Sequence, residues 1–454
     1  SGRPIKGDGT KRKTVVAVLP YTLTGAQQRT LAEIDADMGS DTRMLRLLQG
    51  DVGSGKTVVA LLAMLSAIEA GGQAALMAPT ELLAQQHFQT LEPLCQGCGV
   101  SIAFLSGRIK GKAREEVLAD IASGSTHILV GTHALFQKDV AFDDLMLAVV
   151  DEQHRFGVHQ RLELAQKGRA VDMLVMTATP IPRTLTLTAY GDMDASRLDE
   201  KPLGRKPIDT RLVNLERLAE TIGAAQRAIK SGAKVYWVCP LVEESEVSDL
   251  AAAEDRHKHL SQILGDSAVA LVHGRMKGPE KDAAMASFGS TEPDSPKVLV
   301  ATTVIEVGVD VPLATVMVVE HAERFGLAQL HQLRGRIGRS DKASTCLLLY
   351  QAPLTETATA RLNILRETDD GFLIAEEDLK LRGGGEVLGT RQSGLPEFRL
   401  ADLAIHGDLL LMAQDDTKLI LEKDSDLKTV RGEALRTLLY LFEQDAAIQT
   451  LRSG

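Results

Sequence analysis

The first part of the chain alternates short apolar runs with longer segments in which apolar and polar positions recur at helical spacing. A short apolar run bounded by turn residues predicts a buried strand, and the longer periodic segments predict helices. The expected strands are Met44–Leu48, Ala74–Met77, Ile102–Leu105, Ile128–Val130, Leu145–Val150 and Met173–Met176. Helices are expected at Lys56–Glu69 and from Glu81 onward. This alternation predicts a parallel sheet covered by helices on both faces.

A second alternation of the same kind follows a segment rich in proline and basic residues. The segment Lys201–Pro207 holds two prolines, one glycine and three cations, a composition typical of a linker. The expected strands beyond it are Thr210–Val213, Lys234–Val238, Val269–Val272, Val298–Ala301, Val316–Val319 and Cys346–Leu349. Helices are expected at Leu215–Lys230, Leu250–Ile263 and Pro279–Phe288. The sequence therefore predicts two α/β lobes in tandem.

The strand pattern fades after about Gln351. A helix is expected at Leu354–Arg366, a flexible glycine-rich stretch at Gly383–Gly394, and an amphipathic helical tail over about Ala401–Leu451. The third part of the chain is thus expected to be mostly helical.

Composition excludes several classes of protein. The chain has 454 residues, of which 44% are hydrophobic and 25% charged, so it is expected to be globular. Four cysteines are too few for a disulfide scaffold and favour a reducing, cytoplasmic compartment. The longest nearly unbroken apolar run, Val58–Ile68, is too short to span a membrane. The net charge of −10 argues weakly against a nucleic-acid partner, but phosphates respond to local patches rather than to the total.

A phosphate-binding loop follows the first expected strand. Residues Gly50–Thr57 fit the pattern G-x-x-x-x-G-K-[ST], between a strand and a helix. Lys56 would place its charge at the β and γ phosphates of a nucleotide, and Thr57 would offer a hydroxyl to Mg²⁺. The residues expected to line the phosphates are Gly50, Gly53, Ser54 and Gly55. ATP and Mg²⁺ are the cofactors this loop predicts.

Two adjacent carboxylates follow the strand Leu145–Val150. Asp151 is expected to hold Mg²⁺, directly or through water, and Glu152 to act as the base that polarises the attacking water. Alone, such a pair is more often a solvated turn. The phosphate-binding loop upstream favours the catalytic interpretation.

Two further features fit an ATP site. The amide of Gln27 can donate and accept at once, as recognition of an adenine edge requires, although a surface or capping glutamine is the alternative. Arg336 and Arg339 are three residues apart, so on a helix they would share a face. Brought from the second lobe to the γ-phosphate, they would stabilise charge in the transition state and make hydrolysis depend on lobe closure. An ordinary basic helix is the alternative.

In order, these motifs resemble the core of a superfamily 2 helicase. The blocks that carry the resemblance, beyond the phosphate loop, are Ala78–Leu82, Gly131–His133, Thr177–Pro180, Ala301–Thr303, Gly308–Asp310 and Gln332–Arg339. Two longer strings, Asp151–Val158 and Arg382–Gly394, are similar to those of the RecG family of bacterial fork-remodelling helicases. The second string also resembles the translocation motif of the Mfd family, but Mfd proteins usually have Asp-Glu-Glu-Gln where this chain has Asp-Glu-Gln-His. RecG is therefore preferred, over about Leu19 to Leu411.

The resemblance implies an ATP-driven translocase on double-stranded DNA that regresses stalled forks and branch-migrates Holliday junctions. It implies an N-terminal extension at 1–20, RecA-like domains at 21–203 and 204–352, and a translocation-motif hairpin with a helical region at 353–454. It also implies that Gln332, Gly308 and Asp310 belong to the ATP site. An Mfd-like translocase, an RNA helicase and an ATP-gated clamp without turnover are the rival interpretations.

The resemblance further implies which residues face DNA, mostly hydroxyls, backbone N–H groups and cations suited to a phosphate backbone. They are Thr80, Ser106, Gly107, Arg108, Gly131, Thr132, His133, His273, Gly274, Arg275, Thr302 and Thr303. Thr177 and Thr179 are expected to relay between the ATP and DNA sites. Arg382, Arg391 and Gln392 of the translocation motif are expected to contact duplex DNA. A helical hairpin around Thr355–Leu381 is expected to move the loop that carries them. For single glycines and threonines, a turn or helix cap is the alternative.

Two departures from the family pattern matter. Only about 20 residues precede the segment Leu23–Gln27, which holds the candidate adenine-binding Gln27. This leaves no room for the family's N-terminal wedge domain, so the chain looks like the motor part of a RecG helicase. Gly384 stands where the family commonly has proline. The family further implies a monomer, branched and double-stranded DNA and possible contact with single-stranded-DNA-binding protein as partners, and no membrane association.

Overall fold

The computed structural model describes residues 2–151, 167–182, 185–186, 193–202, 204, 206–240, 246–302, 311–338, 342–386 and 406–441. The chain separates into two compact units. One combines Ser1–Pro180 with Ala195–Leu381 and holds both sheets, and the other combines Ile181–Asp194 with Arg382–Gly454. None of the described helices combines the length and the hydropathy needed to cross a bilayer.

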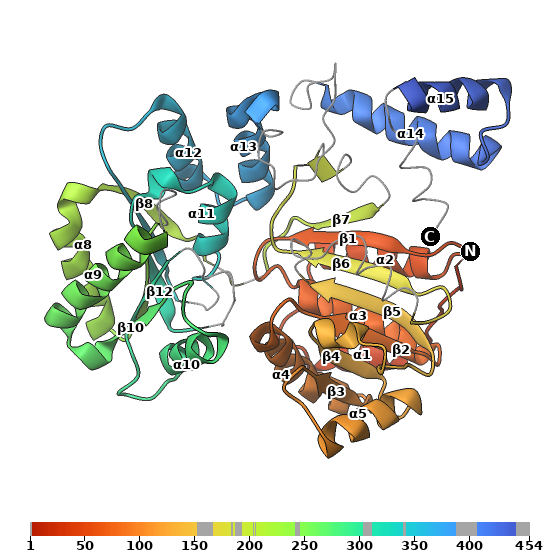
Figure 1. Ribbon diagram of the computed structural model, residues 1–454, viewed down its shortest axis with the longest axis horizontal. Helices are drawn as coiled ribbons and strands as arrows, with labels where there is room; N and C mark the ends of the chain where they lie inside the picture. Colours follow the sequence, from red (N-terminus) through yellow and green to blue (C-terminus); the bar gives the residue numbers. More distant parts are fainter. Residues whose placement is uncertain are drawn as a thin grey trace. The chain divides into compact units, whose positions relative to one another are not determined.

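The first sheet has seven strands in the order β3-β4-β2-β5-β6-β1-β7 (Figure 1). The strands are β1 Leu45–Gly50, β2 Gln73–Met77, β3 Ile102–Leu105, β4 Ile128–Gly131, β5 Leu145–Asp151, β6 Asp172–Thr177 and β7 Asp194–Leu198. The pairings from β3 through β1 are all parallel, with Ala74 opposite Ile128 and Leu47 opposite Val175. Parallel strands direct their carboxyl ends to one edge, where β1, β5 and β6 deliver the predicted ATP-site motifs.

Helices cover both faces of this sheet. They are α1 Thr10–Val18, α2 Gly25–Met38, α3 Lys56–Glu69, α4 Glu81–Gly97, α5 Lys112–Ala122 and the 3-10 turn η1 His133–Phe136. Apolar side chains of α1 to α4 pack on one face, and those of α5 and η1 on the other. Helix α3 is apolar nearly all round and buried from Val58 to Ile68, as expected for a helix enclosed by its neighbours.

The second sheet has six strands in the order β10-β11-β9-β12-β13-β8, and every pairing in it is parallel. The strands are β8 Asp209–Asn214, β9 Lys234–Val238, β10 Val269–Val272, β11 Val298–Ala301, β12 Ala314–Val319 and β13 Thr345–Tyr350. Along β9, Val235 and Trp237 pack on one face while Tyr236 and Val238 pack on the other. Trp237 is 0% exposed and its indole N–H donates to Glu320 at 2.6 Å, so it is a core residue of this sheet.

Helices also cover both faces of the second sheet, α8 and α9 on one side and α10 to α13 on the other. Their bounds are α8 Leu218–Lys230, α9 Glu246–Leu264, α10 Gly278–Gly289, α11 Leu327–Arg334, α12 Glu356–Glu367 and α13 Gly371–Glu386, with 3-10 turns η3 Leu215–Arg217, η4 Asp266–Ala268 and η5 Ala322–Arg324. The second compact unit contains α14 Gly407–Asp424 and α15 Val430–Leu441. The predicted fold class, two parallel-sheet α/β lobes with a helical C-terminal region, is confirmed.

Two local expectations were wrong. Helix α11 ends at Arg334, so Arg336 lies in a turn beyond the helix rather than on a helical face. Gly335 follows the helix end, and Gly338 takes a left-handed φ of 72°, a conformation that glycine accepts readily. The start of the glycine-rich stretch is helical, because α13 continues to Glu386; Ile374 of the same helix is buried in the core of the second lobe.

Candidate nucleotide and nucleic-acid site

The predicted phosphate-binding loop lies between the end of β1 and the start of α3. Gly53 and Gly55 have left-handed φ angles of 76° and 89°. A Cβ at Gly55 would collide with the side-chain nitrogen of Gln27, so both backbone conformation and space require glycine there. The first backbone N–H groups of a helix lack acceptors within the helix, and at the N-terminus of α3 such groups are available to hold phosphate.

Two polar groups in the loop are suited to an anionic ligand. Lys56 is 9% exposed, and its ammonium donates to the backbone carbonyls of Gly50 at 2.6 Å and Asp51 at 3.0 Å. The hydroxyl oxygen of Ser54 is buried without a hydrogen-bond partner among the described residues. A buried donor without a partner is unfavourable, and a phosphate oxygen would satisfy it. The loop therefore fits the phosphates of a nucleotide.

Gln27 is 1% exposed and uses both ends of its amide. Its oxygen accepts from the Thr24 N–H at 2.9 Å in a capping box at the start of α2, and its nitrogen donates to the Ser54 carbonyl at 2.9 Å. Gln27 thus ties α2 to the phosphate loop.

An open groove of about 520 Å³ lies beside the start of α2. It is lined by Val16, Leu19, Pro20, Tyr21, Thr22, Leu23 and Gln28. Apolar walls with an exposed aromatic ring suit a flat heterocycle. This groove was not predicted from the sequence, although Tyr21, two residues before Leu23, was an available signal.

Asp151 ends β5, and its carboxylate meets a histidine that the sequence analysis missed. His87 Nε2 lies 2.6 Å from Asp151 Oδ2, and both side chains are buried. His87 is on the buried stripe of α4 with Ala84 and Leu91, where a lone polar residue could have been suspected of facing a polar partner. Glu152, the predicted base, lies outside the described residues.

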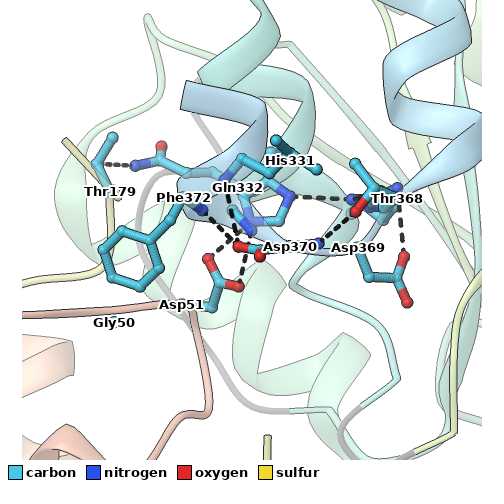
Figure 2. Close-up of polar contacts among 12 residues, drawn as sticks. Gly50, Asp51, Thr179, His331, Gln332, Thr368, Asp369, Asp370 and Phe372 are labelled. Atoms are coloured by element: carbon cyan, nitrogen blue, oxygen red, sulfur yellow. Dashed lines mark hydrogen bonds and ion pairs between the residues drawn. The ribbon is translucent and has the colours of Figure 1, made fainter. Parts of the chain in front are cut away.

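Helix α11 of the second lobe forms hydrogen bonds with the phosphate loop and with the Thr177–Pro180 segment of the first lobe. The Gln332 amide nitrogen donates to the Thr179 hydroxyl, and Thr177 Oγ1 accepts from the Thr179 N–H at 3.2 Å. His331 Nε2 lies 2.8 Å from Asp51 Oδ1 in the phosphate loop (Figure 2). The structure therefore brings the Gln332 segment to the phosphate loop and the Thr177–Pro180 segment, while Arg339 lies outside the described residues.

Hydrogen-bond geometry fixes the tautomer of His331. Arg334 donates to His331 Nδ1 at 3.0 Å, and a guanidinium has only donors, so Nδ1 must accept. The ring proton is then on Nε2, which donates to Asp51. Burial alone would raise the pKa of Asp51, but hydrogen bonds from His331 and the Gly371 N–H, with the charge of Lys56, hold this pKa below its ordinary value.

Arg334 itself is buried and binds the turn between α12 and α13. Its guanidinium donates to the carbonyls of Leu365 and Thr368 and lies 3.4 Å from the Asp369 carboxylate. A buried guanidinium with several acceptors is a rigid connection.

In the first lobe, the candidate DNA-facing residues lie at strand ends and helix starts. Thr80 caps α4, and Gly131 ends β4 just before Thr132 and His133. Ser106 donates to Glu81 at 3.0 Å, ahead of Gly107 and Arg108. Arg108 is 3.1 Å from Glu81 and 3.2 Å from Asp282 of α10, so carboxylates surround the one guanidinium among these residues.

In the second lobe, two of the candidates are neighbours. His273 follows β10 and Thr302 follows β11, and Val272 pairs with Ala301. The His273 Nδ1 and Thr302 Oγ1 atoms are buried without a hydrogen-bond partner among the described residues, which suits an incoming polar ligand. The Gly274 carbonyl accepts from Lys281 at 3.0 Å, and Arg275 is exposed. Outside the described residues lie Thr303, Gly308, Asp310, Arg391, Gln392 and the side chain of Arg382.

Three protein-family models match the chain. The model described as DEAD/DEAH box helicase matches residues 24–188, and that described as Helicase conserved C-terminal domain matches residues 214–341. The model described as ATP-dependent DNA helicase RecG, domain 3, C-terminal, matches residues 368–441.

Individual proteins match over most of this chain. It is 53% identical over 406 residues to the ATP-dependent DNA helicase RecG of Escherichia coli (strain K12), covering 88% of this chain and 58% of that protein. It is 48% identical to the protein of that name from Haemophilus influenzae, covering 94% and 62% respectively. A solved structure of RecG bound to a three-way DNA junction superposes with a TM-score of 0.75 at 42% identity, covering 90% of this chain and 53% of that one. The chain thus spans 58–62% of the length of these two curated relatives.

Proposed function

Because this chain belongs to the RecG family of ATP-dependent DNA helicases, we propose that it is an ATP-driven translocase on double-stranded DNA that remodels branched DNA. The observation that carries the proposal is the contact of α11 with the phosphate loop, which brings the second lobe to the nucleotide site. The proposed reaction is hydrolysis of ATP to ADP and phosphate, with lobe closure moving the DNA. In the family, such motion regresses stalled replication forks and branch-migrates Holliday junctions in recombination and repair.

The phosphate loop binds the nucleotide in this proposal. Lys56 exchanges its contacts with the Gly50 and Asp51 carbonyls for the β and γ phosphates, and Ser54 gains a partner for its buried hydroxyl. Thr57 and Asp151 supply oxygen ligands for Mg²⁺, which would neutralise phosphate charge.

Hydrolysis requires a base and cations at the γ-phosphate. Glu152 takes a proton from the attacking water, and Arg336 and Arg339 stabilise the negative charge that develops on the phosphoryl oxygens. Gln332 positions these arginines, supported by its hydrogen bond to Thr179. Gly308 and Asp310 complete the second-lobe side of the site.

The adenine base is assigned to the groove beside Tyr21. A ring with an exposed face provides a stacking surface, and the Gln27 amide at the start of α2 has the donor and acceptor that an adenine edge needs. Gln27 would have to exchange at least one of its present hydrogen bonds for the base.

The proposed DNA-binding surface consists of the residues of both lobes that are expected to face the DNA backbone, together with Arg382, Arg391 and Gln392. The partnerless His273 Nδ1 and Thr302 Oγ1 atoms support a phosphate contact at the β10–β11 edge. The match of the RecG domain 3 model supports duplex DNA over RNA, and RecG over an Mfd-like translocase. The family also favours a cytoplasmic monomer that meets single-stranded-DNA-binding protein.

Steady-state ATPase assays test the proposal, using no nucleic acid, single-stranded DNA, plain duplex, a branched fork and RNA. We expect stimulation by duplex or fork, and stimulation by RNA alone would overturn the DNA assignment. Preference for the fork would show that these lobes sense branches themselves. Glu152→Gln should retain nucleotide binding and abolish turnover, whereas unchanged hydrolysis would refute the base assignment. Lys56→Ala, which should lose nucleotide binding, is the matched control.

A further inference from the structure

We propose that Asp51 and His331 are positioning residues that hold the N-terminus of α13 on the phosphate loop, so that the nucleotide controls this helix directly. The inference rests on the proposed function only in taking the ligand of the loop to be a nucleotide. It concerns a contact between residues 320 positions apart in the sequence.

The Asp51 carboxylate joins three elements. Its Oδ1 accepts from His331 of α11 at 2.8 Å (Figure 2). Its Oδ2 accepts from the backbone N–H of Gly371, the first residue of α13, at 3.3 Å. The first N–H groups of a helix lack acceptors within the helix, and the helix dipole favours a negative charge beside them. Asp51 therefore caps a helix that lies far from it in sequence.

The contact leaves no space for a side chain on the helix. A Cβ added to Gly371 would overlap Asp51 Oδ1, His331 Nε2 and the ring of Pro180. The absence of a side chain at this residue thus allows the carboxylate to reach the helix N-terminus.

His331 keeps the carboxylate in place. Arg334 fixes its tautomer from the Nδ1 side, so its Nε2–H points to Asp51 and cannot serve as an acceptor. The low pKa of Asp51 means that the carboxylate is charged at neutral pH, which strengthens its hydrogen bond to the Gly371 N–H.

The backbone of Asp51 responds to the ligand of the loop. Its carbonyl accepts from Lys56 at 3.0 Å and from the Ser54 N–H at 3.0 Å. When Lys56 turns to a phosphate, this carbonyl loses its charged donor and keeps the Ser54 N–H, so the Asp51 peptide is held less firmly. The same residue that caps α13 is therefore the one whose backbone changes partners on nucleotide binding.

Helix α13 can transmit such a movement along its length. It has 16 residues and so extends about 24 Å. Ile374 is buried in the core of the second lobe, and Arg197 lies 5.0 Å from the ring centroid of Phe372. The helix ends at Glu386, within the string that resembles the translocation motif.

Hydrogen exchange of the first α13 amides tests the inference, with and without a non-hydrolysable ATP analogue and Mg²⁺. Loss of a cap should raise their exchange about fivefold, the equivalent of about 1 kcal/mol. We expect the analogue to change exchange at 371–375 in the wild type. In Asp51→Ala, exchange should be faster without the analogue and should no longer respond to it.

A second variant and a control separate the capping contact from general damage. Gly371→Ala leaves the loop sequence intact and should abolish the response while nucleotide binding, measured with a fluorescent analogue, persists. Asp370→Ala is the matched control. The Asp370 carboxylate caps the same helix by accepting from the N–H groups of Phe372 and Leu373, whereas Asp51 accepts from Gly371, so the response of this variant should persist.

The outcomes distinguish the inference from the proposed function. If wild-type protein binds the analogue but 371–375 do not respond, or if both Asp51→Ala and Gly371→Ala respond normally, the link is refuted. If the wild type does not bind nucleotide, the proposed function fails. The positioning role is then decided by exchange in Asp51→Ala without ligand, where an unchanged rate would refute it.

Discussion

Replacing Asp172 by asparagine should stabilise the first lobe at alkaline pH and leave it nearly unchanged at acidic pH. Asp172 is 1% exposed at the start of β6. Its Oδ1 accepts from the Met44 N–H at 2.8 Å, and its Oδ2 is buried without a hydrogen-bond partner among the described residues. Burial, reinforced by the charge of Asp37, raises the pKa of this carboxyl to about 7, against the lowering effects of Met44 and Arg43. Asparagine keeps the acceptor for Met44 and removes the charge.

The sign and size follow from proton linkage. Between about pH 4 and pH 7 the folded protein holds a proton that the unfolded chain releases, so this group's contribution to stability falls as pH rises. A shift of the pKa from 3.8 to about 7 corresponds to about 4 kcal/mol, an upper value because water entry would reduce it. The advantage of Asp172→Asn should therefore grow with a slope of up to about 1.4 kcal/mol per pH unit as pH approaches 7, and then level off.

Native-state hydrogen exchange of the β1 and β6 amides, followed from pH 5 to pH 8 and corrected for intrinsic rates, measures this difference within the first lobe. The exposed Asp120→Asn is the control and should show no such trend. A difference between Asp172→Asn and wild type that does not change across this range would refute the reasoning.

Three further changes test other contacts. His87→Ala removes a hydrogen bond from the carboxylate that ends β5, so apparent Mg²⁺ affinity in nucleotide binding should fall about tenfold; an unaltered Mg²⁺ titration would separate His87 from the metal site. Asp282→Asn removes a carboxylate 3.2 Å from Arg108, so duplex DNA should bind about two- to fivefold more tightly at low salt and equally at high salt, and weaker binding at low salt would contradict this. Gly55→Ala should weaken nucleotide binding at least about tenfold in equilibrium titration, because φ is +89° and the added Cβ collides with the Gln27 side chain. Gly71→Ala is the control, because Gly71 has a φ of +93° but open space around it. Equal effects of the two substitutions on nucleotide binding would contradict the steric argument.

The local pattern of apolar and polar residues was sufficient to predict strands and helices that are largely buried. The apolar run at Lys234–Val238 and the helix at Lys56–Glu69 were predicted with the bounds that the structure has. Short helices such as α1 and α5 were missed, because few of their residues are buried and the apolar periodicity is weak.

Motifs located the phosphate loop and Asp151, but their partners depend on tertiary structure. Nothing near His87 in the sequence indicates Asp151, and nothing near Asp51 indicates Gly371. The turn at Arg336 could have been predicted from Gly335 and Gly338, because glycine is common where a helix ends. The three-residue spacing of the arginines does not by itself indicate that the helix continues.

The buried indole of Trp237 gives the second lobe a fluorescence signal that the first lobe, which has no tryptophan, lacks. It is the one tryptophan in the sequence and lies in the core of the second sheet, with Arg256 6.0 Å from its ring centroid and its N–H on Glu320. Tryptophan emission therefore reports on the second lobe, and exclusion of the indole from water should shift the emission to shorter wavelengths. A denaturant titration followed by tryptophan fluorescence will record unfolding of the second lobe, while circular dichroism will record unfolding of both lobes. Any separation of the two curves measures how independently the lobes unfold, without a label on either.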